Sequence, residues 1–402
     1  MSRGGDSRNG LPGGFPAALF TALIVIVSFL DTMAQLPILG PYAVSFGTGA
    51  IFTGVILGSY SLVNMMGNLL AGPVIDAHDR EITIMIGLVL AGVAVASYAA
   101  VINPWQLLLV RIIHGAGGGI LIPAVFAWAG DQSRKGAVGR TMGHAGAAVA
   151  LAAMLGPALG GVGGARFGPR AVFLSLGILL CVTALALGVR YGHSRIRRVA
   201  PRPAPDGLDR SALPGVLRDK HLGGTFRAIF SLTFAMGTLA YTMPLTMVRW
   251  GFSTGHTGLL FSVSSVAAIV LLLSPANRLP DRVGPTPVIR AGLLLVTVAL
   301  VGLVFLRSLP LLVVVMSVYG MGFGAVFAAT TTAVVSATGR NRRGTAFGVY
   351  YAFFSLGVFI GPIAAGAIEA AGAIPYWGAV AVIVLIQALP VPSRRSAETR
   401  SG

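Results

Sequence analysis

The sequence has little charge, few acidic residues and almost no cysteine. Of its 402 residues, 10% are charged, 12 are aspartate or glutamate, and one, Cys181, is a cysteine. A single cysteine excludes a disulfide framework and a cysteine-rich metal site. The small charged fraction, with 55% hydrophobic residues and a mean hydropathy of +0.83, leaves too little polar surface for a water-soluble globule. We therefore expect a membrane protein.

Long hydrophobic runs make up most of the chain. Blocks of about 20 apolar residues, the length with which a helix crosses a bilayer, recur along it. We predict an all-α membrane protein with twelve transmembrane helices at 15–41, 50–73, 82–102, 105–129, 139–163, 171–189, 224–248, 256–275, 287–306, 309–336, 344–368 and 373–390. The first block lacks a small-residue cleavage site, so we expect a retained helix rather than a signal peptide.

The basic residues indicate an orientation. The net charge is +17, and with the N-terminus inside, the outer loops hold only Arg166, Arg170, Arg249 and Arg307. Because lysine and arginine concentrate in cytoplasmic loops, we expect a multi-pass protein of the cell's inner or plasma membrane with both termini in the cytoplasm. No basic stripe interleaved with aromatic residues lies outside the loops, which argues against a nucleic-acid partner.

A shift of 205 residues aligns the two halves of the chain. It places Gly143, Gly156, Pro157 and Gly161 on Gly348, Gly361, Pro362 and Gly366. The arginine- and proline-rich stretch between the halves cannot bury a core. We predict an N-terminal six-helix bundle (1–189), a cytoplasmic linker (190–223) and a C-terminal six-helix bundle (224–402). Parallel duplication relates such bundles by an axis along the membrane normal, with a site between them.

The glycines and prolines of the fifth and eleventh spans suit a membrane helix. In water a central proline costs about 3 kcal/mol and each glycine about 1 relative to alanine. In a bilayer, small residues let helices pack closely, and neighbours satisfy the carbonyl that a proline frees. We expect Gly156-Pro157 and Gly361-Pro362 to form a kink or swivel against a partner helix.

These residues resemble the major facilitator superfamily and, within it, the proton-coupled drug antiporters. The fifth-helix signature of those antiporters is G, eight residues, G, three residues, GP, two residues, GG. This sequence matches it with Gly143, Ala152 in place of the second glycine, Gly156, Pro157, Gly160 and Gly161. The resemblance implies an exporter that uses a proton gradient, needs no cofactor and works as a monomer.

Two further segments look like the family's G-x-x-x-D-R-x-G-R loop. The loop after the second span keeps Gly72, Asp76 and Arg80 but has Ala77 in place of the first arginine. After the eighth span, Asp281, Arg282 and Gly284 form a cleaner copy. An acid in this loop can pair with a neighbouring helix end or arginine, and that contact must break when the halves rock. We expect these residues to form a conformational latch.

Asp31 is the clearest acid deep within a predicted span. Arg111 lies in RIIHGAGGG of the fourth span, which resembles the family's R-x-x-x-G motif. An arginine at mid-depth costs about 2.5 to 3.5 kcal/mol on insertion scales, so it should face the interior and find a partner. Asp31 lies at a similar depth, and an ion pair between them is a geometric possibility.

Burial favours the neutral carboxyl whereas an arginine favours the carboxylate, so Asp31 can change its protonation with its surroundings. His114 shares the helix face of Arg111 and is a candidate proton relay, or else a hydrogen-bonded packing residue. The substrate contacts, each of which packing alone would also explain, are predicted from spans that line the central cavity in this superfamily: Gln35, Tyr60, Asn64, Tyr241, Tyr319, Tyr350 and Phe354.

The sequence thus favours a proton-coupled exporter (antiporter) of small hydrophobic or cationic compounds that works by alternating access. The alternative on the same fold is a proton-coupled importer of sugars or organic acids. A membrane enzyme would need clustered acids, histidines or a nucleophile with a base inside the bilayer. Most of the 12 acids lie in loops, so we expect neither catalysis nor a metal site.

Overall fold

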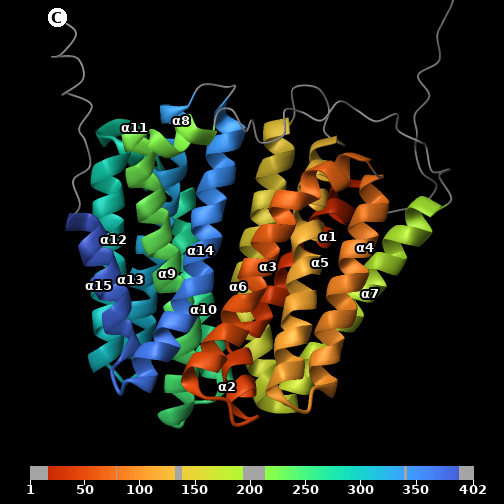
Figure 1. Cartoon of the computed structure of the whole chain (residues 1–402), viewed down its shortest axis with the longest axis horizontal. Helices are drawn as coiled ribbons and strands as arrows, with labels where there is room; N and C mark the ends of the chain where they lie inside the picture. Colours follow the sequence, from red (N-terminus) through yellow and green to blue (C-terminus); the bar gives the residue numbers. More distant parts are fainter. Residues whose placement is uncertain (1–16, 78, 132–137, 193–212, 339–341, 389–402) are drawn as a thin grey trace, which may run out of the picture.

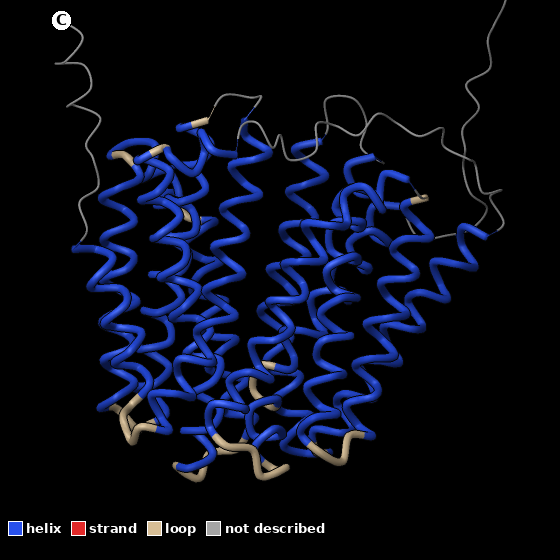
Figure 2. The backbone as a smooth tube through the Cα atoms, viewed as in Figure 1, coloured by secondary structure: helices blue, strands red, loops and turns tan. Residues whose placement is uncertain are grey.

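A computed structural model describes residues 17–77, 79–131, 138–192, 213–338 and 342–388. Throughout these ranges the chain forms helices joined by short turns, without a strand (Figures 1 and 2). The prediction of an all-α protein is confirmed.

The first half contains α1 (Ala17–Gln35), α2 (Leu39–Val44), α3 (Ala50–Ala77), α4 (Arg80–Ser97), the 3₁₀ turn η1 (Tyr98–Ala100), α5 (Pro104–Asp131), α6 (Val138–Phe167) and α7 (Pro169–Gly192). The second half contains α8 (Leu213–Arg218), α9 (Lys220–Arg249), α10 (Thr254–Leu273), the 3₁₀ turn η2 (Pro275–Arg278), α11 (Leu279–Val283), α12 (Pro285–Phe305), α13 (Leu309–Ala337), α14 (Arg343–Ala370) and α15 (Pro375–Ala388).

The long helices match the predicted spans. Within the described residues, ten helices are long and apolar enough to cross a membrane. Two shorter apolar helices, Leu19–Gln35 and Pro375–Ala388, correspond to the first and last spans. The outer surfaces carry large exposed apolar side chains such as Val93, Leu185 and Val270, which a bilayer covers. The twelve-helix prediction is confirmed.

Two local predictions were wrong, and a third segment, after the eighth span, has a defined helical structure. The first span is not continuous to residue 41, because α1 ends at Gln35, before Pro37, and α2 begins at Leu39. Gly72 and Asp76 lie within α3 rather than in a loop. Asp281 and Arg282 lie in the short helix α11, which is followed by Gly284 with φ of 87°. That left-handed backbone favours glycine, so Gly284 is the helix terminator.

Each half has its own hydrophobic core. In the first half, α1, α4 and α5 bury Ile24, Leu88 and Leu121. In the second, α9, α12 and α13 bury Leu232, Leu300 and Met316. Tyr241 and Ala365 of the second half pack into the first core, so the two cores meet.

The halves meet at one end of the helices. We call the end where α7 finishes and α9 begins the linker end, and the opposite end the far end. Figure 1 shows the halves converging at the far end (bottom) and separating toward the linker end (top). At the far end, Gly54 of α3 lies against the backbone of Pro362 in α14, and Gly161 of α6 lies against Gly258 of α10. A Cβ on any of these glycines would clash, so the contact requires glycine.

Hydrogen bonds join the halves at the same end. The Tyr241 hydroxyl donates to the carbonyl of Ala50 at 3.2 Å. The Thr254 hydroxyl donates to the carbonyl of Gly161 at 2.9 Å. Backbone packing and hydrogen bonds together close the far end.

Candidate functional site

A buried acid and a buried histidine form the centre of the candidate site. Asp31 of α1 is 3% exposed and His114 of α5 is 0% exposed. Their Oδ2 and Nε2 atoms are 2.8 Å apart. A charged group is retained in a low-dielectric interior only when it has such partners. The sequence prediction that Asp31 and His114 face the protein interior agrees with this geometry.

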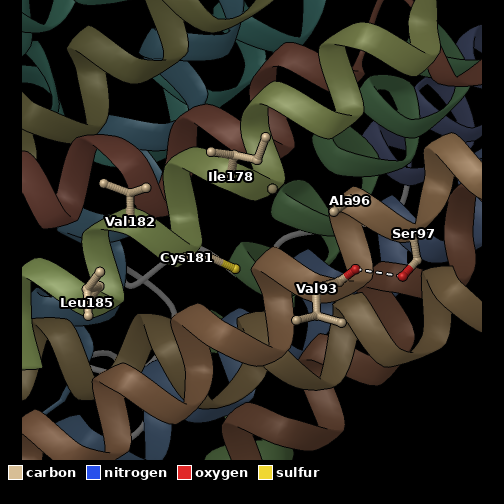
Figure 3. Close-up of a pocket in the computed structure, with 8 residues that line it drawn as sticks. Val93, Ala96, Ser97, Ile178, Cys181, Val182 and Leu185 are labelled. Carbon is tan, nitrogen blue, oxygen red and sulfur yellow. Dashed lines mark hydrogen bonds between the residues drawn. The ribbon is translucent and has the colours of Figure 1, made fainter.

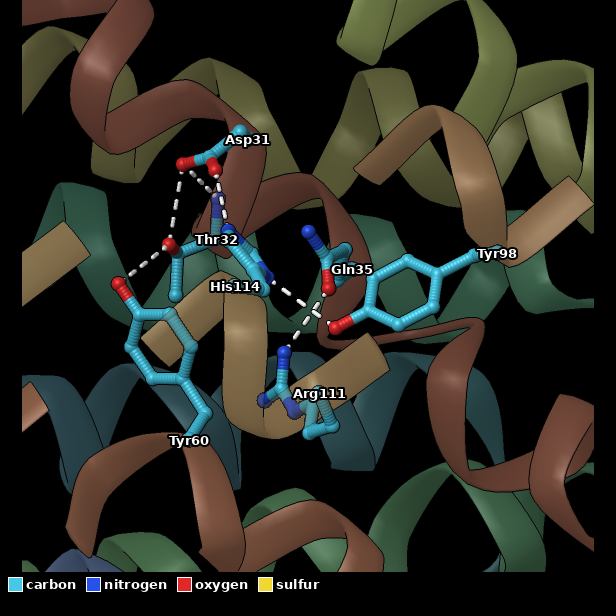
Figure 4. A network of polar contacts seen from close by, with 7 residues as sticks. All are labelled: Asp31, Thr32, Gln35, Tyr60, Tyr98, Arg111 and His114. Carbon is cyan, nitrogen blue, oxygen red and sulfur yellow. Dashed lines mark hydrogen bonds and ion pairs between the residues drawn. The ribbon is translucent and has the colours of Figure 1, made fainter. Parts of the chain in front are cut away.

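A second contact lies one helical turn from the first. Arg111 Nη1 donates to Gln35 Oε1 at 3.0 Å, and Nη2 donates to the carbonyl of Leu57 at 3.4 Å. Because α1 and α5 run in opposite directions, Gln35 and Arg111 are both displaced toward the far end, forming a second rung beside Asp31 and His114 (Figure 4).

In the described part of the chain, Asp31 and Arg111 do not form the direct ion pair that the sequence suggested. Asp31 bonds to His114, and the guanidinium of Arg111 instead lies 4.8 Å from the ring centroid of Tyr60. The physical reason is the register of the two helices, which sets His114 rather than Arg111 level with the carboxyl group. The spacing of four residues from Asp31 to Gln35 and three from Arg111 to His114 fits this two-rung arrangement.

Two tyrosines complete the polar network. The Tyr98 hydroxyl lies 3.1 Å from His114 Nδ1, and Figure 4 shows His114 between Asp31 and Tyr98. Tyr60 stacks obliquely on the other side of His114, with ring centroids 4.7 Å apart. Its hydroxyl accepts a bond from the Thr32 hydroxyl at 3.4 Å. Sequence reasoning missed Tyr98, because nothing in its own span marks a tyrosine near the end of α4 as a partner of α5.

The arrangement of His114 accommodates an added proton. With Nε2 donating to the Asp31 carboxylate, a neutral His114 accepts at Nδ1 from the Tyr98 hydroxyl. An imidazolium donates from both nitrogens, and Tyr98 then accepts through its oxygen. Both contacts therefore survive a change of one unit charge. The site can hold or release a proton without rebuilding its hydrogen bonds.

The predicted substrate residues do not form one site. Gln35 and Tyr60 belong to the network around Arg111. Tyr241 takes part in the far-end closure. Tyr350 is fully buried, and its hydroxyl is 3.0 Å from that of Thr330. The other three are the buried Tyr319 and the half-buried Asn64 and Phe354.

The predicted hinge residues mostly lie at helix contacts. A Cβ on Gly156 or Gly160 would clash with α1, and one on Gly361 would clash with α9. Pro157 offers its carbonyl side to Gly258 across the interface, as Pro362 does to Gly54. Gly143 differs, because a Cβ added there would have no atom within 4 Å. It therefore takes no part in close packing.

The predicted latch residues are only partly connected. Arg80 pairs with Asp131 of α5 at 3.4 Å, which ties the start of α4 to the end of α5. Asp281 and Arg282 are exposed, and neither has a hydrogen bond or ion pair with another described residue. The side chains of residues 69–78, which include Asp76, lie outside the described part of the chain.

Two grooves lie on the outside of the bundles and contain none of these residues. One, between α4 and α7, is lined mainly by apolar side chains, together with Ser97 and Cys181 (Figure 3). The other lies between α10 and α13. In the described part of the chain, no group of three or more histidine, cysteine, aspartate or glutamate side chains could hold a metal ion.

Comparisons with known proteins point to one family. The family model described as Major Facilitator Superfamily matches residues 21–362 and 225–398. The multidrug resistance protein MdtG of Dickeya zeae is 26% identical over 362 residues, covering 89% of this chain and 85% of that protein. A multi-drug resistance efflux pump PmrA homolog of Lactococcus lactis is 25% identical over 361 residues, covering 88% and 87%.

A solved structure has the same fold. It is a bacterial homolog of the human lysosomal transporter Spinster, in an inward-facing and occupied conformation. The superposition has a TM-score of 0.76 at 16% sequence identity and covers 93% of this chain and 95% of that one.

Proposed function

The chain belongs to the Major Facilitator Superfamily, and we propose that it is a proton-coupled exporter of small hydrophobic or cationic compounds. It is a multi-pass membrane transporter and not an enzyme. In our proposal it works by alternating access as a monomer, with the proton gradient as its energy source and no cofactor.

Export is the direction that the relatives support. Two of them carry names that describe multidrug resistance or efflux, although each shares only about a quarter of its residues with this chain. The basic residues support a cytoplasmic position for both termini. With that orientation, the closed far end faces outward and the linker end faces the cytoplasm.

The observation that carries the proposal is the buried pair of Asp31 and His114. When the protein opens outward, the pair takes up a proton and substrate leaves. The halves then rock, and at the cytoplasmic side incoming substrate displaces the proton. Each proton that moves down a potential of 100 mV contributes about 2.3 kcal/mol. Opening outward requires the far-end contacts of Gly54 and Gly161 to separate, which makes the glycine-rich parts of α6 and α14 the gate.

Ethidium transport into proteoliposomes tests both coupling and direction, since the charge of ethidium does not change with pH. An antiporter concentrates ethidium in an acidic lumen, whereas a symporter requires an acidic exterior. We expect wild-type protein and Asp79→Asn, a control at the start of α4, to respond to an acidic lumen. Asp31→Asn should lose this response.

Two results would count against the proposal. If Asp31→Asn still concentrated ethidium in response to the pH gradient, the coupling group would lie elsewhere. If wild-type protein responded to an acidic exterior, the importer alternative would replace the antiport assignment. If it responded to neither gradient, the antiport assignment would also be wrong.

A further inference from the structure

One side of α14 changes its surroundings along its length. At the far end, Pro362 contacts both Gly54 of α3 and Gly237 of α9, so this side of α14 faces the junction between the halves. Tyr351 lies three helical turns before Pro362, and the two side chains differ by only about 20° in their direction around the helix axis. Tyr351 therefore lies on the same side of α14, nearer the linker end.

The exposure of Tyr351 follows from the separation of the halves. Pro362 is buried between the halves, whereas Tyr351 is 51% exposed. The neighbouring Tyr350 points about 100° away and is fully buried against Thr330. Figure 1 shows α3 and α14 diverging toward the linker end. From the helical position of Tyr351 relative to Pro362, we infer that its ring lies on the side of α14 that borders the space between the two helices.

Tyr351 is the middle of a strip of three aromatic rings. Its ring centroid is 6.3 Å from that of Phe347 and 6.4 Å from that of Phe354. Rings prefer centroid separations of about 4.5 to 7 Å, so these contacts hold the strip together along one side of α14. Phe347 and Phe354 are half-buried, which leaves Tyr351 as the most accessible ring. We call these three residues the aromatic strip.

Amide side chains occupy the corresponding part of α3. Asn68 lies four helical turns after Gly54, and the two positions differ by about 40° in their direction around the helix axis. Asn68 is therefore on the side of α3 that faces α14, at the level where the halves have separated. Its Nδ2 donates to Asn64 Oδ1 at 3.0 Å. The Nδ2 of Asn64 is buried beside Gly118 of α5 and has no hydrogen-bond partner among the described residues, so Asn68 is the exposed amide of this pair. The aromatic strip and Asn68 thus belong to different halves.

We propose that the aromatic strip binds the planar aromatic part of the substrate, with Tyr351 as its main contact. Asn68, which Asn64 holds through its hydrogen bond, offers a hydrogen bond to a polar substituent of the same molecule. Stacking accepts many ring systems because it needs only a flat π surface, and a cationic ring gains further from the face of Tyr351. The proposal rests on the proposed function, because it assumes that the protein carries a small organic molecule, and it defines the class of that molecule.

Equilibrium binding to purified protein tests the proposal without any gradient. The probes are ethidium, a planar aromatic cation, and tetraphenylphosphonium, an aromatic cation of equal charge that is not flat. Tyr351→Ala should weaken ethidium binding by at least about fivefold and should change tetraphenylphosphonium binding much less. Tyr351→Phe keeps the ring and should bind ethidium nearly as wild type does.

A control variant removes a ring elsewhere that is more exposed than Tyr351. Phe305 at the end of α12 is 68% exposed on the outside of the bundle, and Phe305→Ala should leave both affinities unchanged. Unchanged melting temperatures would exclude misfolding as a cause. Equal losses for both cations in Tyr351→Ala, no loss for ethidium, or no binding of ethidium by wild-type protein would overturn the proposal. Failure of proton coupling would appear only in the liposome assay, so the two proposals can fail separately.

Discussion

The two halves share their helix packing but differ in the chemistry of their interiors. In the first half, Gly156 lies against Met33, and 205 residues later Gly361 lies against Thr238. The same shift places Asp31, Arg111 and His114 of the first half on Met236, Met316 and Tyr319 of the second. Tyrosine aside, the buried polar side chains described in the second half are all serine or threonine. Among the described residues, the repeated scaffold therefore carries buried acidic and basic side chains in the first half and not in the second.

This difference suggests that the halves divide the work of transport. The first half holds the groups whose protonation can change, and the second half presents the aromatic strip. Close glycine packing joins the two halves at the far end. When the halves rock about these contacts, the protonatable groups of the first half move relative to the aromatic strip of the second. The following substitutions exchange residues between equivalent positions and so test that division.

The largest effect is expected from His114→Tyr, which gives the first half the residue that the second half has at the equivalent position, Tyr319. Tyrosine cannot take the place of an imidazole that bonds Asp31 and Tyr98 at once. We expect gradient-driven ethidium transport to fall by about a hundredfold, the scale at which proton-transfer groups act. The reverse change, Tyr319→His, should alter transport less than threefold. Equal losses in both variants would contradict a division of work.

Exchanging Arg111 of the first half and Met316 of the second for each other's residue should lower stability in both cases. Arg111→Met leaves Gln35 Oε1 and the carbonyl of Leu57 without a donor, at a cost of about 1 to 3 kcal/mol per buried group. Met316→Arg should cost about 3 kcal/mol or more, because Met316 is 0% exposed within an apolar core. Melting temperatures in detergent measure both. A stable Met316→Arg protein would show that the second interior can accept a charge.

Much of the fold could be predicted from the sequence, because the length and hydrophobicity of a membrane helix are properties of one segment. The break at Pro37 was missed because the apolar run continues through it. The two-rung arrangement was missed for another reason. One helical turn spans about 5.4 Å, and counting residues from predicted helix ends does not fix the relative register of α1 and α5 to better than one turn.

The candidate site shows the same limit. Asp31 stands out as the clearest acid in an apolar span, so its burial could be predicted. Tyr98 could not, because its role depends on α4 packing beside α5. Tyr350 and Tyr351 are adjacent in sequence, yet Tyr350 is buried and Tyr351 is 51% exposed. Since α14 is apolar on all sides, its sequence pattern does not distinguish the face that meets α3 from the face that meets α9.

A smaller effect is expected at Gly160, where the halves differ by one methyl group. A Cβ on Gly160 would overlap the carbonyl of Ala34, whereas the equivalent position in the second half is Ala365. Gly160→Ala should lower stability by about 1 to 3 kcal/mol, because α1 and α6 must separate. Gly143→Ala, where no atom lies within 4 Å, should instead stabilise by up to about 1 kcal/mol. A similar melting temperature for both variants would contradict the close packing of α1 and α6.

The smallest effect is expected from Tyr319→Phe. The Tyr319 side chain is 4% exposed, and its hydroxyl has no hydrogen-bond partner among the described residues. Burying such a group carries a desolvation cost, so removing the hydroxyl should raise the stability by up to about 1 kcal/mol and leave transport unchanged. Melting temperature and ethidium transport, measured on the same preparation, check both expectations. A loss of transport with unchanged melting would mean that the hydroxyl bonds to substrate or to another helix in a different state of the cycle. In that event both halves would contribute a polar group at this equivalent position. The halves would then differ only in that the buried polar groups of the first half can carry charge.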